Sequence, residues 1–186
     1  RGVRYVKSGE ADQHLRGWIA NVLSKQGYIM REPLYNKVLD LAVEFQAYRG
    51  RVVYQGLSLF ETKNGAYTGN IIAPEERKKE MLSNYIDMDI VEGALRDIAI
   101  LAQDKISPLY TGPFGIDMMV VRNNHDEHVL HPCVELNLRR TMGHVALSLP
   151  TAFDVSTKVM RICYDKTYRL RITRSEGDKT LVDWDD

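Results

Sequence analysis

The residues best suited to chemistry lie in two consecutive hydrophobic segments in the second half of the chain. Asp117 belongs to the first segment, and Glu135, Asn137 and Arg139 occupy alternate positions of the second. Side chains point alternately to the two faces of a β-strand, so these three residues would share one face. Mg²⁺ prefers carboxylate and amide oxygens as ligands, and an arginine binds phosphate oxygens in a bidentate manner. The pattern is compatible with a site for a magnesium ion together with a phosphate compound.

The polar turn between the two segments determines which residues face each other. A turn centred on Asp126 places Asp117 opposite Glu135, with Asn137 diagonal to Asp117. Two carboxylates directly opposed on paired strands repel each other and destabilise the pair. A divalent cation would offset this repulsion, and so would the neighbouring arginines on a solvated polar face, Arg139 and Arg140. The spacing by itself is compatible with both interpretations.

The period of the hydrophobic residues predicts the elements that hold these segments. The expected helices are 9–26, 75–85 and a third that is capped by Asp89 and ends before Pro108. The expected strands are 39–46, 52–61, two strands within 114–138 joined by a polar turn at 123–128, and a last hairpin of 158–164 and 168–173. Residues 62–70 contain two glycines and are expected to form a loop, and His144 is expected to cap a helix, with a phosphate contact as the alternative. Helices between antiparallel hairpins indicate an α+β fold: an antiparallel sheet with helices packed on one face.

Composition and charge narrow the class of protein. The 186 residues include 25 Lys and Arg against 25 Asp and Glu, so the formal net charge is zero and no nucleic-acid partner is expected. No apolar run reaches the roughly 18 residues of a membrane span, so no membrane partner is expected. Cys133 and Cys163 lie in apolar, strand-like runs, which indicates reduced core thiols in a cytoplasmic protein. The chain begins at Arg1 within an apparently structured segment, so we expect it to be a fragment of a longer protein.

The segment Glu135-Leu136-Asn137-Leu138-Arg139, preceded by Gly115-Ile116-Asp117, resembles the metal-binding end of the ATP-grasp superfamily. Residues 30–34, Met-Arg-Glu-Pro-Leu, resemble the hinge between the two lobes that enclose ATP, and residues 1–3 resemble the end of the glycine-rich loop that covers the phosphates. The resemblance covers residues 1–147. It implies that residues 1–34 are the end of the nucleotide-covering lobe and the hinge, and that residues 35–186 form an ATP-grasp-like C-terminal lobe.

The resemblance also implies cofactors and residue roles. The cofactors are ATP and Mg²⁺, with Mg²⁺ held by Asp117, Glu135 and Asn137. Arg139 is the implied catalytic residue, which stabilises the charge of the transferring phosphoryl group. The implied nucleotide contacts are the backbone groups of Glu32 and Leu34 with adenine, and the carboxylate of Asp40 with the ribose hydroxyls.

The reaction that the resemblance implies is ATP-dependent ligation. A small-molecule or peptide carboxylate is activated as an acylphosphate, which an amine or a thiol then attacks. The lysine-bearing strand and most of the glycine-rich loop of the family would lie before Arg1, so the fragment alone is expected to be inactive. Two alternatives remain open: a catalytically inactive, ATP-grasp-like nucleotide-binding module, and an α+β interaction domain that binds no nucleotide.

Overall fold

The computed structural model describes Arg4, Val6 and residues 12–63, 66–149, 157–163 and 169–174, with residues 163 and 169–174 described by their backbone alone. The resemblance noted for residues 1–3 therefore lies outside the described part of the chain. Two compact units are present, Arg1–Tyr35 and Asn36–Asp186. Among the described helices, none combines the length and the apolarity that crossing a bilayer requires.

The first unit contains helix α1 (Gln13–Gln26). Asp12 precedes it and accepts a hydrogen bond from the backbone N–H of Leu15 at 2.7 Å, which fixes the start of the helix. Gly27 ends it with φ 80°, a left-handed conformation that favours glycine. The predicted C-terminal end is therefore confirmed. Residues 28–35, which include the expected hinge, contain no helix or strand.

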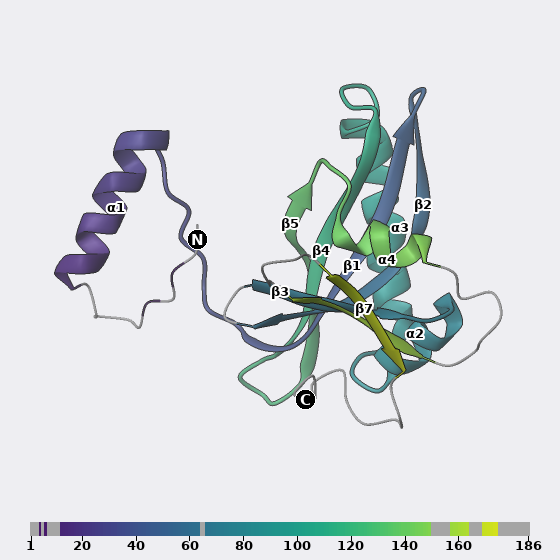
Figure 1. The fold of residues 1–186 in the computed structure, drawn as a ribbon. Helices are drawn as coiled ribbons and strands as arrows, with labels where there is room; N and C mark the ends of the chain where they lie inside the picture. The colour runs from purple at the N-terminus through teal and green to yellow at the C-terminus, as the bar shows by residue number, and fades with distance from the viewer. Residues whose placement is uncertain are drawn as a thin grey trace. The chain divides into compact units, whose positions relative to one another are not determined.

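The second unit contains one seven-stranded sheet with the order β5-β4-β1-β2-β3-β6-β7 (Figure 1). Its strands are β1 (Asn36–Tyr48), β2 (Arg51–Lys63), β3 (Ala66–Ile72), β4 (Gly112–Arg122), β5 (His128–Asn137), β6 (Lys158–Cys163) and β7 (Arg169–Arg174). Its helices are α2 (Glu75–Ser83), α3 (Met88–Lys105) and α4 (Met142–Ser148). All neighbouring strands pair in the antiparallel sense. The predicted α+β class with an antiparallel sheet is confirmed.

One face of the sheet carries the hydrophobic core, and α2 and α3 cover it. Alternate residues of β1 point to this face, as the period of two predicts, and they are almost fully buried: Leu39, Leu41, Val43, Phe45 and Ala47. Phe114 of β4 stacks on Phe45 with ring centroids 5.1 Å apart. Leu82 of α2 and Val91 of α3 pack into the same cluster. This face fixes the register of the strands, since a slip of one residue would turn the core side chains to the other side.

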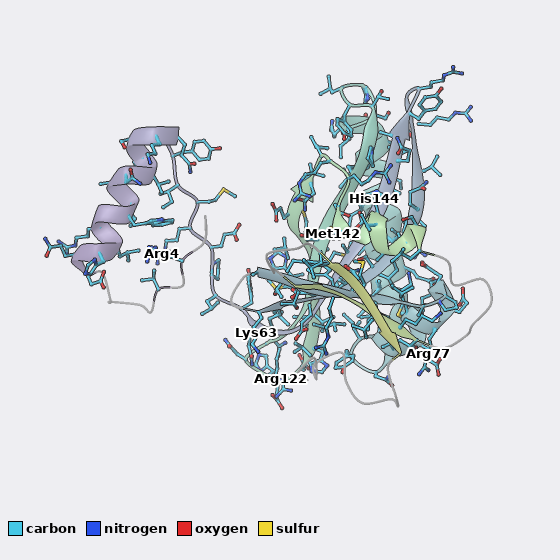
Figure 2. All side chains as sticks on the ribbon, viewed as in Figure 1. Arg4, Lys63, Arg77, Arg122, Met142 and His144 are labelled. Atoms are coloured by element: carbon cyan, nitrogen blue, oxygen red, sulfur yellow. The ribbon has the colours of Figure 1, made fainter. Side chains whose placement is uncertain are left out.

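The opposite face is polar near the middle of the sheet, and α4 lies across it. In Figure 1, α3 lies behind β1 and β2 and α4 lies in front of them, and Figure 2 labels Met142 and His144 on α4. Glu44, Ser58 and Asn70 are buried on this face. Buried polar side chains need hydrogen-bond partners, and α4 supplies some of them. The expectation that the helices pack on one face therefore holds for α2 and α3 and is wrong for α4.

The loop predicted for residues 62–70 is a further error. Strand β2 continues to Lys63, β3 begins at Ala66, and these two residues pair with each other. Residues 64 and 65 lie outside the described part of the chain. Their sequence, Asn-Gly, is the strongest short signal for a two-residue hairpin connection, so glycine here indicates a hairpin instead of an extended loop.

The prediction of a buried thiol at Cys133 is also wrong, because Cys133 is exposed and free. It lies on β5, the edge strand of the sheet, where the pairing with β4 is irregular. An apolar run on an edge strand does not have a neighbour on both sides to cover it. Only the backbone of Cys163 is described, so the prediction for its thiol is not tested.

Candidate functional site

Asp117 of β4 and Glu135 of β5 lie directly opposite each other, as the sequence predicts. Asn137, two residues after Glu135 on the same face of β5, pairs with Gly115. Directly opposed residues of antiparallel strands have Cβ atoms about 4.5–5.5 Å apart. Two carboxylates at that separation are close enough for one cation to contact both. The sheet therefore brings together the three residues that the sequence assigned to a metal site.

The strands reach this register by an irregular route. At the tip of the hairpin Arg122 pairs with His128, so the turn is centred one residue earlier than predicted. The pairing shifts between the pair of Met119 with His131 and the pair of Asp117 with Glu135. Over this stretch β5 contains two more residues than β4. Pro132 lies in this irregular stretch, where its missing N–H costs no ladder hydrogen bond. The extra residues restore the opposition of Asp117 and Glu135, which a regular hairpin with this tip would lack.

The electrostatic environment raises the pKa of Asp117 from 3.8 to about 7. Burial is the largest cause, followed by the negative charges of Glu135, Glu44 and Asp40, while a hydrogen bond with Asn137 acts in the opposite direction. Burial and the neighbouring carboxylates therefore make Asp117 compete for a proton near neutral pH. This excess of negative charge suits a divalent cation.

The side chains of Asp117, Glu135 and Asn137 could offer two carboxylates and one amide oxygen to a cation. Within the described residues, no three His, Cys, Asp or Glu side chains are arranged around a common point. Asn137, two residues after Glu135 on the same face of β5, adds an amide oxygen beside these carboxylates. Hard oxygen ligands of this kind, few in number, fit Mg²⁺, which keeps several of its own waters and shares the rest of its shell with phosphates.

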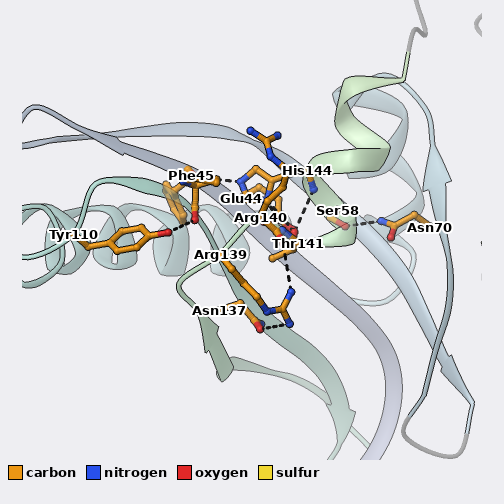
Figure 3. Close-up of polar contacts among 11 residues, drawn as sticks. Glu44, Phe45, Ser58, Asn70, Tyr110, Asn137, Arg139, Arg140, Thr141 and His144 are labelled. Atoms are coloured by element: carbon orange, nitrogen blue, oxygen red, sulfur yellow. Dashed lines mark hydrogen bonds and ion pairs between the residues drawn. The ribbon is translucent and has the colours of Figure 1, made fainter.

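Arg139 lies over Asn137 at the point where β5 ends. The backbone N–H of Arg139 donates to the carbonyl of Asn137 at 2.8 Å, a three-residue turn that stops the regular strand. The guanidinium of Arg139 then donates from Nη2 to Oδ1 of Asn137 at 2.8 Å (Figure 3). The turn, and not strand alternation, is what places this arginine next to the amide oxygen.

Glu44 is the functional candidate that sequence reasoning missed. It lies on β1 with its side chain only 1% exposed, and it pairs across the sheet with Gly115, which in turn pairs with Asn137. Thr141 Oγ1 donates to its Oε1 at 2.8 Å, and Nδ1 of His144 lies 2.9 Å from its Oε2 (Figure 3). The available signal was a charged residue inside an otherwise buried strand.

His144 completes this buried group and caps α4. It forms a capping box with Thr141, which confirms the predicted capping role, and its Nε2 donates to the carbonyl of Phe45 at 3.1 Å. Burial by itself lowers the pKa of His144, but the hydrogen bond and charge of Glu44 outweigh it, so the pKa lies above 6.5. In the capping box Nδ1 accepts the backbone N–H of Thr141, which requires the neutral imidazole with its proton on Nε2. When the imidazole is protonated, Nδ1–H points instead to Oε2 of Glu44 while Nε2–H still donates to Phe45. In the protonated form of His144, the side chains of His144 and Glu44 are a buried ion pair that joins α4 to β1.

Two glycines make room for the carboxylate of Glu44. A Cβ on Gly115 would overlap Oε2 of Glu44 and lie 2.9 Å from Cγ2 of Thr141. A Cβ on Gly143 would overlap Oε1 of Glu44 and lie 2.8 Å from Oγ of Ser58. Such distances are shorter than side chains tolerate, so both positions require glycine while Glu44 keeps this conformation.

Asp40, the residue expected to face ribose, lies on the same face of β1 as Glu44. Its Oδ2 accepts hydrogen bonds from Nζ of Lys37 at 2.5 Å and from Oγ1 of Thr62 at 2.7 Å. It also contributes to the raised pKa of Asp117. The carboxylate is therefore fixed in position on the polar face. The expected adenine contacts, Glu32 and Leu34, lie in the first unit, so their relation to this face stays a prediction.

A small cavity of about 200 Å³ lies where β2 and β3 separate, beneath α4. Leu57 pairs with Val43 of β1, but β2 pairs with β3 only from Phe60 onward, so the backbone groups of Leu57 that face the β3 side have no partner in β3. Side chains of α2 take that place: Glu75 Oε2 accepts from the N–H of Leu57 at 3.0 Å, and Nζ of Lys78 donates to its carbonyl. Burial lowers the pKa of Lys78, while Glu75 raises it in part. Glu75 and Lys78 thus supply the hydrogen bonds to the Leu57 backbone that a neighbouring strand would otherwise supply.

No family model and no curated protein matches the sequence. Among solved structures, the chain is similar to N5-carboxyaminoimidazole synthetase from Staphylococcus aureus complexed with ADP, with 14% identity over 70% of this chain and 36% of that chain, and a TM-score of 0.42. It is similar to a biotin carboxylase–β-γ-ATP complex from Campylobacter jejuni, with 11% identity over 79% of this chain and 35% of that chain, and a TM-score of 0.49. It is also similar to a candidate ATP-grasp superfamily protein from Archaeoglobus fulgidus, with 16% identity over 76% of this chain and 47% of that chain, and a TM-score of 0.41. The chain spans less than half the length of each of these structures.

Proposed function

We propose that this chain is the metal- and nucleotide-binding lobe of an ATP-grasp-type, Mg²⁺-dependent ligase. The opposition of Asp117 and Glu135 across β4 and β5, with Asn137 beside them, is the observation that carries the proposal. Opposed carboxylates destabilise a strand pair by themselves, and burial followed by the charge of Glu135 raises the pKa of Asp117. A bound divalent cation removes this destabilisation, so the arrangement is understandable as a binding site.

Different residues contact different parts of Mg²⁺-ATP in this proposal. Asp117, Glu135 and Asn137 hold the ion, which when bound neutralises phosphate charge and orients the phosphates for transfer. Arg139 meets the oxygens of the transferring phosphoryl group, where its fork of donors fits phosphate geometry. Asp40 accepts hydrogen bonds from the ribose hydroxyls. The backbone groups of Glu32 and Leu34 bind adenine from the hinge.

The proposed reaction joins a carboxylate to an amine or a thiol at the expense of ATP. The carboxylate oxygen attacks the terminal phosphorus with loss of ADP, and the nucleophile then displaces phosphate from the acylphosphate. Positioning and charge neutralisation supply most of the rate enhancement in reactions of this kind. The carboxylate is a small molecule or a peptide, and we place the protein in the cytoplasm.

Calorimetric titration of the chain with Mg²⁺-ATP tests the proposal. Glu135→Gln removes one ligand charge with little change of shape, and we expect it to weaken binding by about tenfold or more, since a lost charged contact is worth at least about 1.5 kcal/mol. Glu80→Gln on α2 is the matched control, because Glu80 is exposed and pairs only with Arg77 among the described contacts. Equal affinities in the two variants and the unaltered chain would refute the metal assignment.

A second measurement separates a ligase from an inactive nucleotide-binding module. The full-length protein is incubated with Mg²⁺-ATP and pools of carboxylates and amines, and ADP release is followed. A ligase releases ADP only when both substrate classes are present. Tight Mg²⁺-ATP binding without any ADP release favours the inactive module, and no binding of either ATP or Mg²⁺ favours the interaction domain.

A further inference from the structure

Arg139 carries a positive charge in a strongly acidic place and yet binds a neutral acceptor. Its Nη2 donates to Oδ1 of Asn137 at 2.8 Å, and its Nη1 makes a long 3.4 Å contact with the carbonyl of Arg140. Within the described residues Arg139 forms no ion pair, although Asp117 and Glu135 lie on the same sheet face as Asn137. Its charge is therefore not committed to a carboxylate and is available to another anion.

The acceptor that Arg139 uses is the amide oxygen that the metal site needs. Asn137 is 6% exposed at the end of β5, and the turn at that end directs the arginine back over it. A guanidinium and a divalent cation at one amide oxygen repel each other strongly at such short range, even in a partly polar medium. Occupation of Oδ1 by one of them therefore disfavours occupation by the other.

We propose that Arg139 exchanges between two acceptors, the amide oxygen of Asn137 and a bound phosphate, and thereby couples metal binding to phosphate binding. Without phosphate, the guanidinium occupies Oδ1 of Asn137 and weakens the affinity of the site for a divalent cation. A polyphosphate offers Arg139 a charged acceptor, the arginine leaves Asn137, and the amide oxygen becomes available as a metal ligand. This inference rests on the proposed function, because it assumes that Asn137 is a metal ligand and that phosphate is the anion.

The coupling must be reciprocal, since both ligands act on the same equilibrium of Arg139. If phosphate raises the affinity for the cation, the cation raises the affinity for phosphate by the same factor. The site then binds the metal–nucleotide complex in preference to either component. A free cation or a free nucleotide would each occupy the site poorly.

Binding of Mn²⁺ alone, followed by the electron paramagnetic resonance signal of the free ion, provides the test. Arg139→Met removes the charge and the donor while keeping an unbranched side chain. Arg140→Met is the matched control, because it removes the same charge from the adjacent position. We expect Arg139→Met to bind Mn²⁺ roughly fivefold or more tightly than the unaltered chain, the lower end of typical coupling factors, and Arg140→Met to change the affinity much less.

Tripolyphosphate completes the measurement. It should tighten Mn²⁺ binding in the unaltered chain and do so distinctly less in Arg139→Met, since that variant has no arginine to withdraw. A double-mutant cycle with Asn137→Ala then shows whether the arginine acts through the amide oxygen. In the Asn137→Ala background, we expect Arg139→Met to have no more effect than Arg140→Met has.

The outcomes distinguish this inference from the proposed function. Mn²⁺ affinity that is unchanged or weaker in Arg139→Met, or a gain equal to that of Arg140→Met, overturns the exchange of Arg139 between acceptors and leaves the metal site standing. A gain that persists in the Asn137→Ala background also overturns it, because the arginine would then act by charge alone. Absence of Mn²⁺ binding in both the unaltered chain and Arg139→Met overturns the proposed function and this inference together.

Discussion

Glu44 and Thr141 lie 97 positions apart in the sequence and are joined by a 2.8 Å hydrogen bond between Thr141 Oγ1 and Glu44 Oε1. The same hydroxyl accepts the backbone N–H of His144 at 3.2 Å, so it also caps α4. One side chain thus joins the centre of β1 to the connection between β5 and α4. Arg139 belongs to that connection, and its position depends on how firmly the two ends of the connection are held.

Thr141→Val tests the importance of this link for stability. Valine keeps the shape of threonine but leaves the buried Oε1 of Glu44 and an N–H of α4 without this partner. We expect a loss of about 1–3 kcal/mol in the free energy of unfolding, measured by urea denaturation. Thr111→Val, at an exposed position before β4, should change it by less than about 0.5 kcal/mol. Equal effects of the two substitutions would show that the hydrogen bond contributes nothing.

Gly143→Ala tests the close packing around Glu44. The added Cβ would overlap Oε1 of Glu44 and approach Oγ of Ser58, so the carboxylate or the helix must move. We expect destabilisation of about 1–3 kcal/mol, which is typical of overpacking.

Gly93→Ala on α3 is the control for this substitution. A Cβ on Gly93 meets nothing closer than Nη2 of Arg96 at 3.8 Å. Alanine in a helix interior is favoured over glycine by about 1 kcal/mol, so this variant should be as stable as the unaltered chain or more stable. A Gly143→Ala chain that matched Gly93→Ala would contradict the crowding at Glu44.

The raised pKa of Asp117 predicts a pH dependence of stability in the presence of a chelator. The folded state binds a proton at Asp117 up to about pH 7, whereas the unfolded chain releases it near pH 3.8. The folded state therefore holds more protons between these values, and its stability falls as the pH rises through this range. Asp117→Asn should remove this part of the dependence and be more stable than the unaltered chain at pH 8.

Urea denaturation at several pH values measures this difference. Asp104→Asn, at an exposed position of α3, should leave the pH profile unchanged. Saturating Mg²⁺ should stabilise the unaltered chain at pH 8 and have less effect on Asp117→Asn. An unaltered profile in Asp117→Asn would mean that burial and the neighbouring carboxylates do not act on this side chain as the structure indicates.

His144 should titrate above its ordinary value of 6.5, because Glu44 stabilises the imidazolium. Nuclear magnetic resonance of the imidazole protons measures this pKa directly. Glu44→Gln should lower it, since burial then acts with less opposition. The stability that the ion pair contributes is fully present below pH 6.5 and is lost as the pH rises through the raised pKa. A His144 resonance that titrates identically in both chains would exclude the ion pair.

The strand segments around Asp117 and Glu135 were predictable because alternation is a local property. Hydrophobic residues at every second position identified the strands, and a polar stretch located the turn. The opposition of the two carboxylates then followed from the approximate centre of the turn. The prediction succeeded although the tip lies one residue earlier, because an irregular stretch near Pro132 compensates. No rule applied to the sequence anticipated that irregularity.

The sequence by itself determined the α+β class, the strand pair with Asp117 and Glu135, the end of α1 at Gly27 and the capping role of His144. These features depend on contacts between residues close in the chain or across one hairpin. The tertiary structure alone decided that α4 crosses the polar face, and that Glu44 is buried against it. It also decided that Arg139 occupies the oxygen of Asn137. The first two features depend on how segments distant in the sequence pack against each other. The position of Arg139 depends on a turn that departs from strand geometry. The local period of hydrophobic residues encodes neither.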